Sequence, residues 1–274
     1  MLSIESESMA ASVAHLQASF GPAPAVAVVL GSGWSGVVGQ LQDTKSISYD
    51  HLPAFVPSTV EGHVSEVVVG QAGTQRVVML RGRSHTYETG DCAAMAGALR
   101  SLKAWGVVSI ILTNAAGSLR SAMPPGSLML ITDHINAPQR SPLVGVADSS
   151  SFVDMANAYD PGLLALAQKI AHRKALTLHT GTFLWAIGPQ FETPAEVRLF
   201  AAWGADAVGM STVPETILAR HAGLQVLGLS FITNMAAGLS SEALTHAATL
   251  QNVKNYGDVA GQFLTDLIAH WPAH

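Results

Sequence analysis

Apolar, strand-like runs that each end in a short polar or glycine-rich segment recur along this chain, and they limit the folds open to it. The runs are residues 25–30, 76–80, 107–112, 128–132, 180–187 and 222–232. Stretches with helical periodicity alternate with them, at residues 92–105, 161–174 and 250–270. This alternation predicts an α/β fold with a sheet flanked by helices. Because ligands of such sheets bind beyond the carboxyl ends of strands, the polar segments are candidate site residues.

Length and composition bound the organisation of the chain. The 274 residues suffice for a substantial core, and no linker-like segment divides them. We therefore predict one domain, residues 1–274, in which residues 1–24 form an N-terminal helix and leader. Only 12% of the residues are charged, half the usual share, which suggests surface covered by oligomerisation. A net charge of −5 without a basic block argues against nucleic acid as a partner.

The sequence also predicts a compartment. Cys92 is the single cysteine, so an internal disulfide framework is excluded and a reducing cytoplasm fits. The N-terminal stretch carries Glu5 and Glu7 and lacks a positive n-region, unlike a signal peptide. No apolar run reaches the roughly 18 residues of a membrane span. We expect a soluble cytoplasmic protein.

Residues 204–215 contain the clearest change from strand to helix. An apolar run ends at Met210, and Ser211 and Thr212 follow it. Thr212 and Glu215 have the spacing of a capping box, with Pro214 in the first helical turn. The start of a helix with a free hydroxyl and N–H groups is suited to an anion. The alternative is that this capping box does no more than begin a helix.

Residues 31–36, Gly-Ser-Gly-Trp-Ser-Gly, match the dinucleotide fingerprint, and Asp50 stands about where the ribose-binding acid is expected. A dinucleotide fold needs a full helix and a second strand after these glycines. Here only residues 37–41 are available for such a helix, and a proline-containing loop follows them. A glycine turn whose amides and Ser32 hydroxyl hold one phosphate fits better. A plain tight turn and NAD binding stay open as alternatives.

Arg83, His85, Tyr87 and Glu88 lie within six residues after a strand-like run. Arginine offers a planar fork for a phosphate, and histidine can donate a second hydrogen bond. Alternate spacing puts Arg83, His85 and Tyr87 on one face if the chain stays extended. The alternative is a solvated loop. No His, Cys and Asp cluster has the spacing of a metal site, so no metal is predicted.

A third group combines an aromatic ring with hydrogen-bonding side chains. Phe191 and Glu192 precede a second capping box, formed by Thr193 and Glu196. The ring can stack on a planar ligand while the carboxylate accepts from its N–H groups. Asn234 follows a strand-like run and can both donate and accept. The alternative is that Glu192 interacts only with the helix dipole.

Several of these strings together resemble the trimeric purine nucleoside phosphorylases, the family that also contains the methylthioadenosine phosphorylases. The matching strings span about residues 26–246 in the family's order. They are VVLGSG, FVPSTVEGH, RGRSHTYE, LTNAAGSL, ITDHIN, GPQFETPAEVR, GADAVGMSTVPE and SFITNMAAGLS. The resemblance implies a central mixed, partly barrel-like β-sheet flanked by helices, in a homotrimer. It also implies reversible phosphorolysis of purine nucleosides to free base and ribose 1-phosphate, with inorganic phosphate as co-substrate and no cofactor.

The resemblance further implies a role for each matching residue. Catalysis is assigned to Asn234, His85 and Glu192. The phosphate pocket comprises Ser32, Arg83, His85, the Ala115 N–H and Ser211. Ribose contacts are Tyr87 and Met210, with His246 reaching the 5′-hydroxyl, and the base site comprises Phe191, Glu192, Val208 and Asn234. Phe152, in the long lid-like loop of residues 137–158, is implied to enter a neighbouring subunit's site.

Two positions separate branches of the family. The methylthioadenosine enzymes carry an acidic residue in place of Asn234 and no equivalent of His246, so 6-oxopurines with a free 5′-hydroxyl are expected. Trp34 stands where leucine is usual, and Thr89 interrupts the usual Tyr-Glu-Gly. Xanthosine-preferring members have a tyrosine near Ala186, which is absent here. A methylthioadenosine phosphorylase, a xanthosine-preferring enzyme, a water-using nucleosidase and a binding protein without turnover are the alternatives.

Overall fold

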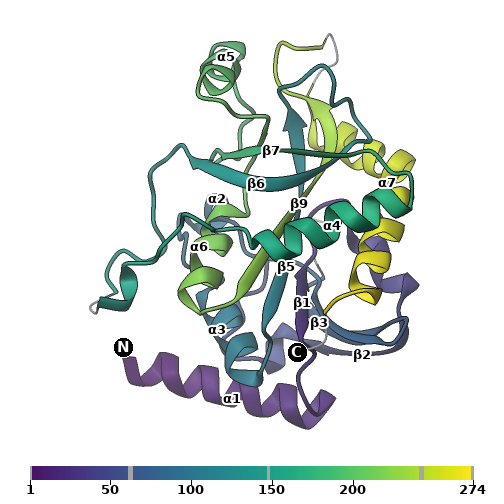
Figure 1. Ribbon diagram of the computed structural model, residues 1–274. Helices are drawn as coiled ribbons and strands as arrows, with labels where there is room; N and C mark the ends of the chain where they lie inside the picture. The colour runs from purple at the N-terminus through teal and green to yellow at the C-terminus, as the bar shows by residue number, and fades with distance from the viewer. Residues whose placement is uncertain (1, 61–63, 147–148, 241–243, 273–274) are drawn as a thin grey trace.

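A computed structural model describes residues 2–60, 64–146, 149–240 and 244–272 of the chain (Figure 1). The described strands form a nine-stranded sheet of order β2-β3-β4-β1-β5-β8-β7-β6-β9, in which β5 also pairs with β9. The strands are β1 (Val26–Val29), β2 (Gln42–Ser48), β3 (Glu66–Ala72), β4 (Gln75–Leu80), β5 (Ser109–Ser118), β6 (Leu128–Asn136), β7 (Leu178–Trp185), β8 (Ala207–Gly209) and β9 (Gln225–Met235). The α-helices are α1 (Leu2–Phe20), α2 (Thr86–Thr89), α3 (Ala96–Trp105), α4 (Pro161–Arg173), α5 (Pro194–Ala202), α6 (Val213–His221) and α7 (His246–Ala269). The 3₁₀ helices are η1 (Ser35–Gln40), η2 (Tyr49–His51) and η3 (Ser149–Ser151).

The sheet closes on itself at one end. Because β5 pairs with both β8 and β9, the strands β5, β8, β7, β6 and β9 form a ring. The pairs β1–β4, β1–β5 and β5–β9 are parallel, whereas β3–β4 and β6–β9 are antiparallel. The predicted fold class, a mixed and partly barrel-like sheet flanked by helices, is confirmed.

Helices cover both faces of the sheet, and the alternation of side chains along β1 shows how. Ala27 and Val29 belong to a cluster shared with residues of α1 and α3, whereas Val26 and Val28 pack with residues of α4 and α7. In Figure 1, α1 and α3 accordingly lie together at the bottom, whereas α4 crosses the centre of the view and α7 lies at the right. Every residue of β1 is buried, which explains its continuous β-branched and alanine sequence.

Several strands extend further than their apolar runs. β5 continues through Asn114 to Ser118, β6 through Asp133 to Asn136, and β9 through Asn234 to Met235. The prediction that these strands end at residues 112, 132 and 232, before these polar tails, is wrong. Ring closure supplies the reason, because the tails keep backbone partners there: Gly117 pairs with both Val208 and Asn234.

β2 was not predicted at all. Residues 42–46 of this edge strand are exposed, so it lacks the apolar alternation that marks a half-buried strand. Its register on β3 shifts between Gln42 and Lys45.

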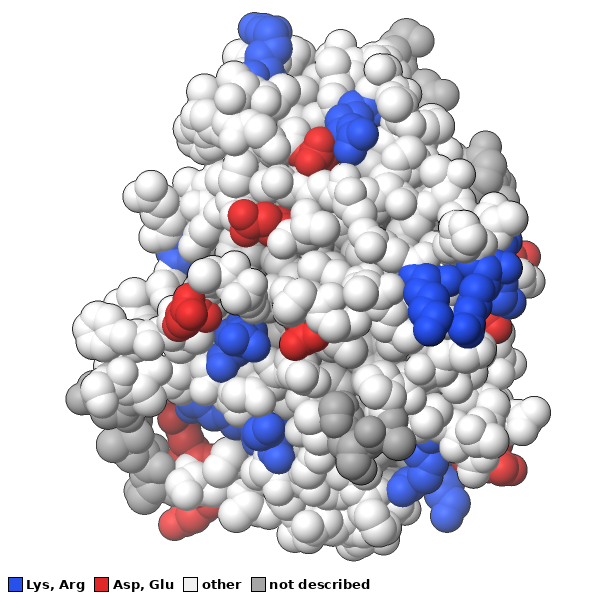
Figure 2. Space-filling model, in the orientation of Figure 1, with Lys and Arg blue, Asp and Glu red and all other residues white. Residues whose placement is uncertain are grey.

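The surface carries few charges. Figure 2 shows one face that is mostly uncharged, with lysine and arginine side chains gathered at its right-hand edge. Among the described residues no helix is long and apolar enough to cross a membrane. Cys92 is a free, half-buried thiol.

Candidate functional site

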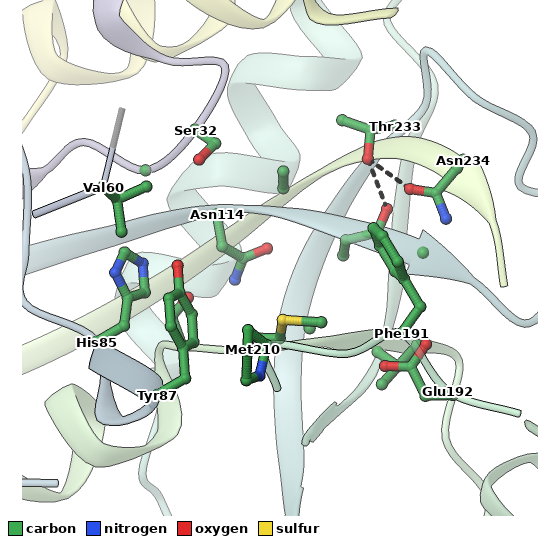
Figure 3. A pocket seen from close by; sticks show the side chains of 18 of the residues that line it. Ser32, Val60, His85, Tyr87, Asn114, Phe191, Glu192, Met210, Thr233 and Asn234 are labelled. Carbon is green, nitrogen blue, oxygen red and sulfur yellow. Dashed lines mark hydrogen bonds between the residues drawn. The ribbon is translucent and has the colours of Figure 1, made fainter. Parts of the chain in front are cut away.

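A cavity of about 370 Å³ opens where β5 and β9 enter the ring (Figure 3). It brings together segments that are far apart in sequence. The lining residues are Gly31, Ser32, Val60, Arg83, His85, Tyr87, Asn114, Ala115, Ala116, Gly117, Pro189, Phe191, Glu192, Val208, Gly209, Met210, Ser211, Thr233 and Asn234. In Figure 3, Ser32, His85 and Tyr87 lie at one end, and Phe191, Glu192 and Asn234 lie at the other. We call these the basic end and the aromatic end.

Ser32 reaches the basic end from a tight glycine turn after β1. The N–H of Gly31 donates to Thr113 Oγ1 at 3.0 Å, which draws the turn against β5. A Cβ at Gly31 would lie 2.7 Å from Arg83 Nη2 and 2.9 Å from the Asn114 Cα, so only glycine fits. The short 3₁₀ helix η1 follows, as expected for a turn that does not open a dinucleotide-binding helix.

Arg83 lies behind this turn, and its side chain is 1% exposed. Its guanidinium donates to the Thr113 carbonyl and, through Nη1, to Glu215 Oε1 at 3.3 Å. The pairing corrects one prediction. Thr212 and Glu215 do not form a capping box, because the Glu215 side chain turns to the buried arginine and Thr212 makes no side-chain cap.

His85 is the N-cap of α2, so the condition for alternate spacing on one face, an extended chain through Tyr87, is not met. The two rings nevertheless stack, with centroids 4.8 Å apart. Glu88 Oε1 lies 2.9 Å from His85 Nδ1 and accepts from the His85 N–H at 2.6 Å. Burial raises the pKa of Glu88, but the N–H groups of Thr59 and His85 outweigh it and lower the pKa to about 2. An anionic Glu88 therefore holds the imidazole of His85 in place.

The aromatic end contains the second carboxylate. Phe191 and Glu192 follow β7 and directly precede α5, whose capping box is confirmed. Thr193 Oγ1 accepts from the Glu196 N–H at 3.2 Å, and Glu196 accepts from the Thr193 N–H at 2.7 Å. Because Glu196 caps the helix, Glu192 is free to line the cavity. Burial raises the pKa of Glu192.

Asn234 faces Glu192 across this end (Figure 3). Its Oδ1 accepts from Thr233 Oγ1 at 2.8 Å, and its Nδ2 donates to the Met235 carbonyl at 2.9 Å. An amide nitrogen carries two hydrogens, so a second donor stays available for a ligand. Gly117 permits this position, because a Cβ there would lie 3.0 Å from Nδ2.

Small residues of β5 separate the two ends. Ala115, Ala116 and Gly117 form one wall, while Met210 lies between Tyr87 and Phe191 in Figure 3. Val208 and Gly209, from β8, complete the lining. A cavity with hydrogen-bonding groups at both ends and a small-residue middle suits an elongated ligand with an anionic part and a planar part.

Eleven of the thirteen predicted site residues line this cavity. Phe152 does not, and it is 90% exposed just after η3. His246 is the first residue of α7, but its side chain lies outside the described residues. The described residues contain no group of three His, Cys, Asp or Glu side chains that could hold a metal ion.

Lining residues that sequence reasoning missed include Val60, Asn114, Gly117, Pro189 and Thr233. Asn114 and Thr233 belong to the polar tails of β5 and β9. The sequence does contain a pattern that indicates these two residues, because each belongs to a Thr-Asn pair that follows an apolar run. Val60 and Pro189 have no comparable signal, since neither residue type carries a hydrogen-bonding side chain.

Comparison with known proteins identifies relatives along nearly the whole chain. Residues 25–269 match the family described as the phosphorylase superfamily. The chain is 42% identical to purine nucleoside phosphorylase 1 of Geobacillus stearothermophilus, covering 87% of this chain and 88% of the relative. It is 44% identical to the purine nucleoside phosphorylase of Mycobacterium leprae, covering 90% and 89%. A crystal structure of Schistosoma mansoni purine nucleoside phosphorylase with inosine superposes with a TM-score of 0.90 at 30% identity, covering 98% of both chains.

Proposed function

The chain belongs to the phosphorylase superfamily and to its purine nucleoside phosphorylases, which are pentosyltransferases, and from this premise we propose its substrates and site roles. The substrates are 6-oxopurine ribonucleosides and deoxyribonucleosides such as inosine and guanosine. Phosphorolysis releases the free base and (deoxy)ribose 1-phosphate, and the reaction is reversible. The observation that carries this preference is that Glu192 and Asn234 both line the aromatic end of the cavity.

At the basic end we assign phosphate to Ser32, Arg83, His85, the Ala115 N–H and Ser211. The guanidinium and imidazole supply charge-assisted donors, which are the stronger hydrogen bonds for an oxyanion. Tyr87, at the basic end, and Met210, between the two ends, are assigned to the ribose, with His246 at the 5′-hydroxyl. Burial and the Glu88 carboxylate raise the pKa of Tyr87 to about 12, so its phenol is a neutral donor at pH 7.

At the aromatic end the purine stacks on Phe191 and packs against Val208. Glu192 accepts from the N1 proton of a 6-oxopurine, and the second hydrogen of Asn234 Nδ2 donates to N7. As the glycosidic bond breaks, negative charge develops on the purine and positive charge on the ribose. Asn234 stabilises the purine anion, and the phosphate beneath the sugar stabilises the cation. No covalent nucleophile is required, because positioning and preorganised electrostatics lower the barrier.

A panel of nucleosides assayed with and without phosphate tests the proposal. Inosine and guanosine are expected to release base only when phosphate is present. Adenosine, xanthosine and methylthioadenosine are expected to react far more slowly. Equal base release without phosphate would identify a nucleosidase, and faster turnover of methylthioadenosine or xanthosine would assign the chain to the corresponding branch.

The pH dependence of nucleoside use should report Glu192. Its carboxylate accepts from N1–H only when ionised, and burial raises its pKa, so binding weakens as pH falls and does so at a higher pH than for an ordinary glutamate. We expect an acid limb in kcat/KM for inosine. The limb should disappear in Glu192→Gln, whose kcat/KM should be lower throughout. A limb unchanged in Glu192→Gln would assign the titration to another group.

We further propose a homotrimer in which Phe152 completes a neighbouring subunit's site. Its 90% exposure and its absence from its own cavity support this role, as does the low charge of the chain. Phe152→Ala is expected to raise KM for inosine severalfold while sedimentation still gives a trimer. Val259→Ala, which also trims an exposed apolar side chain, is the control and should leave KM unchanged. A wild-type monomer in sedimentation would contradict the proposal.

No cofactor is proposed, since phosphate is itself the co-substrate. Activity should therefore survive dialysis against a chelator. The reaction returns a base and a sugar phosphate for reuse, which fits purine salvage in the cytoplasm.

A further inference from the structure

Thr212, which lies behind the basic end of the cavity, adopts a backbone conformation that few side chains tolerate. Its φ is 79° and its ψ is −44°. The Val213 N–H donates to the Ser211 carbonyl at 2.9 Å, which closes a three-residue turn around Thr212. This is the positive-φ γ-turn, the rare and strained form. For a β-branched residue such a conformation persists only where its surroundings hold it.

Two elements hold Thr212 in place. Asn114 Nδ2, from β5, donates to Thr212 Oγ1 at 2.8 Å. The Thr212 carbonyl accepts from both the N–H and the hydroxyl of Thr216, at 2.8 and 2.7 Å. Thr212 is 0% exposed and Asn114 is 2% exposed, so water does not compete for these hydrogen bonds.

The γ-turn places the hydroxyl groups of the adjacent residues Ser211 and Thr212 in different surroundings. Ser211 lines the cavity, whereas Thr212 is absent from its lining and points to Asn114. The two hydroxyl oxygens still lie 3.1 Å apart, within hydrogen-bonding distance. Thr212 thus connects a buried amide of β5 to a hydroxyl on the cavity wall.

The direction of this short chain of hydrogen bonds follows from counting donors. Thr212 Oγ1 accepts from Asn114, and its own hydrogen needs an acceptor because the group is fully buried. The acceptor within reach is Ser211 Oγ. Once Ser211 accepts this hydrogen bond, its own hydrogen is directed elsewhere, and the cavity lies on its open side.

We propose that Thr212 is a positioning residue that orients the Ser211 hydroxyl as a donor toward the phosphate. Asn114 donates to the Thr212 hydroxyl, and the Thr212 hydroxyl in turn donates to Ser211. The strained turn keeps the two hydroxyls within hydrogen-bonding distance while only Ser211 lines the cavity. The inference rests on the proposed phosphate role of the basic end. It concerns Thr212 and Asn114, whose contribution the family resemblance does not describe.

A double-mutant cycle tests the proposal. Thr212→Val keeps the shape and β-branching but removes the hydroxyl, and it should raise KM for phosphate roughly tenfold, the order expected for one hydrogen bond to a charged group. KM for inosine should not change. Ser211→Ala should raise KM for phosphate at least as much. Because Thr212 acts through Ser211, Thr212→Val should add nothing in the Ser211→Ala background.

Thr212→Ser is the matched control, because it retains the hydroxyl and should keep KM for phosphate near the wild-type value. If Thr212→Val does not fold, Thr212→Cys replaces the hydroxyl with a weak donor of similar size and should show the same rise. An unchanged KM in Thr212→Val or Thr212→Cys, or additive effects in the double variant, would overturn the inference.

Phosphate binding measured without turnover separates this inference from the proposed function. Phosphate should raise the Tm of the wild type, and the rise should be smaller at equal concentration in Thr212→Val but not in Thr212→Ser. A wild type that is stabilised by phosphate yet fails to cleave inosine would overturn the proposed function alone. A wild type that phosphate does not stabilise would overturn both.

Discussion

Replacing Asn234 with alanine is expected to lower kcat for inosine phosphorolysis roughly 100-fold or more, the scale of one lost transition-state donor. The reason is that the second hydrogen of Nδ2 is assigned to the purine nitrogen where charge develops as the base leaves. The side chain is already held by Thr233 at 2.8 Å and by the Met235 carbonyl at 2.9 Å, so it needs little reorganisation. Steady-state kinetics with saturating phosphate measure the effect.

The control for this variant is KM for phosphate, which should stay near the wild-type value because the phosphate ligands occupy the opposite end of the cavity. The melting temperature should also change little, since Asn234 is half-buried beside the cavity. Turnover of inosine close to that of the wild type would remove Asn234 from the mechanism.

In Arg83→Met, the initial rate of phosphorolysis is expected no longer to saturate with phosphate. The substitution is also expected to lower the free energy of unfolding by about 3–5 kcal/mol, the cost of breaking a buried ion pair. The two side chains are 1% and 4% exposed, so removal of the guanidinium leaves the Glu215 carboxylate buried without its partner. Urea unfolding and phosphate titration of initial rates measure the two effects separately.

The double variant Arg83→Met with Glu215→Leu distinguishes stability from function. Replacing both members of a buried pair with apolar side chains is often neutral, so most of the lost stability should return. Phosphate saturation should not return, because the donor fork is still missing. A double variant that regains phosphate saturation would show that Arg83 is not a phosphate ligand.

Sequence patterns predicted the core of the fold well where burial was complete. β1 is buried at every residue, and its four β-branched or alanine residues leave little alternative to a strand. They failed for β2, because an exposed edge strand is defined by its partner and not by its own side chains. They also ended β5 and β9 too early, since the pairing that extends them arises from ring closure between distant segments.

The site was predicted largely from polar residues that follow apolar runs, and the family resemblance supplied most of the individual roles. Those roles stay predictions, as does the single-domain boundary. The failure at Thr212 and Glu215 has a clear physical cause. Their spacing satisfies the local capping rule, but Glu215 pairs with Arg83, 132 residues earlier, and Thr212 with Asn114, 98 residues earlier. A rule based on four consecutive residues cannot take account of hydrogen-bonding partners that are distant in the sequence.

The small-residue wall of β5 between the two ends of the cavity has a practical consequence for engineering. Ala115, Ala116 and Gly117 carry no long side chain that would couple one end to the other. Libraries that randomise Glu192 and its neighbours while retaining Asn234 should therefore yield enzymes for unnatural nucleobases that keep the sugar-phosphate half of the chemistry intact. The scaffold is in this sense modular, and its two halves can be evolved in separate rounds.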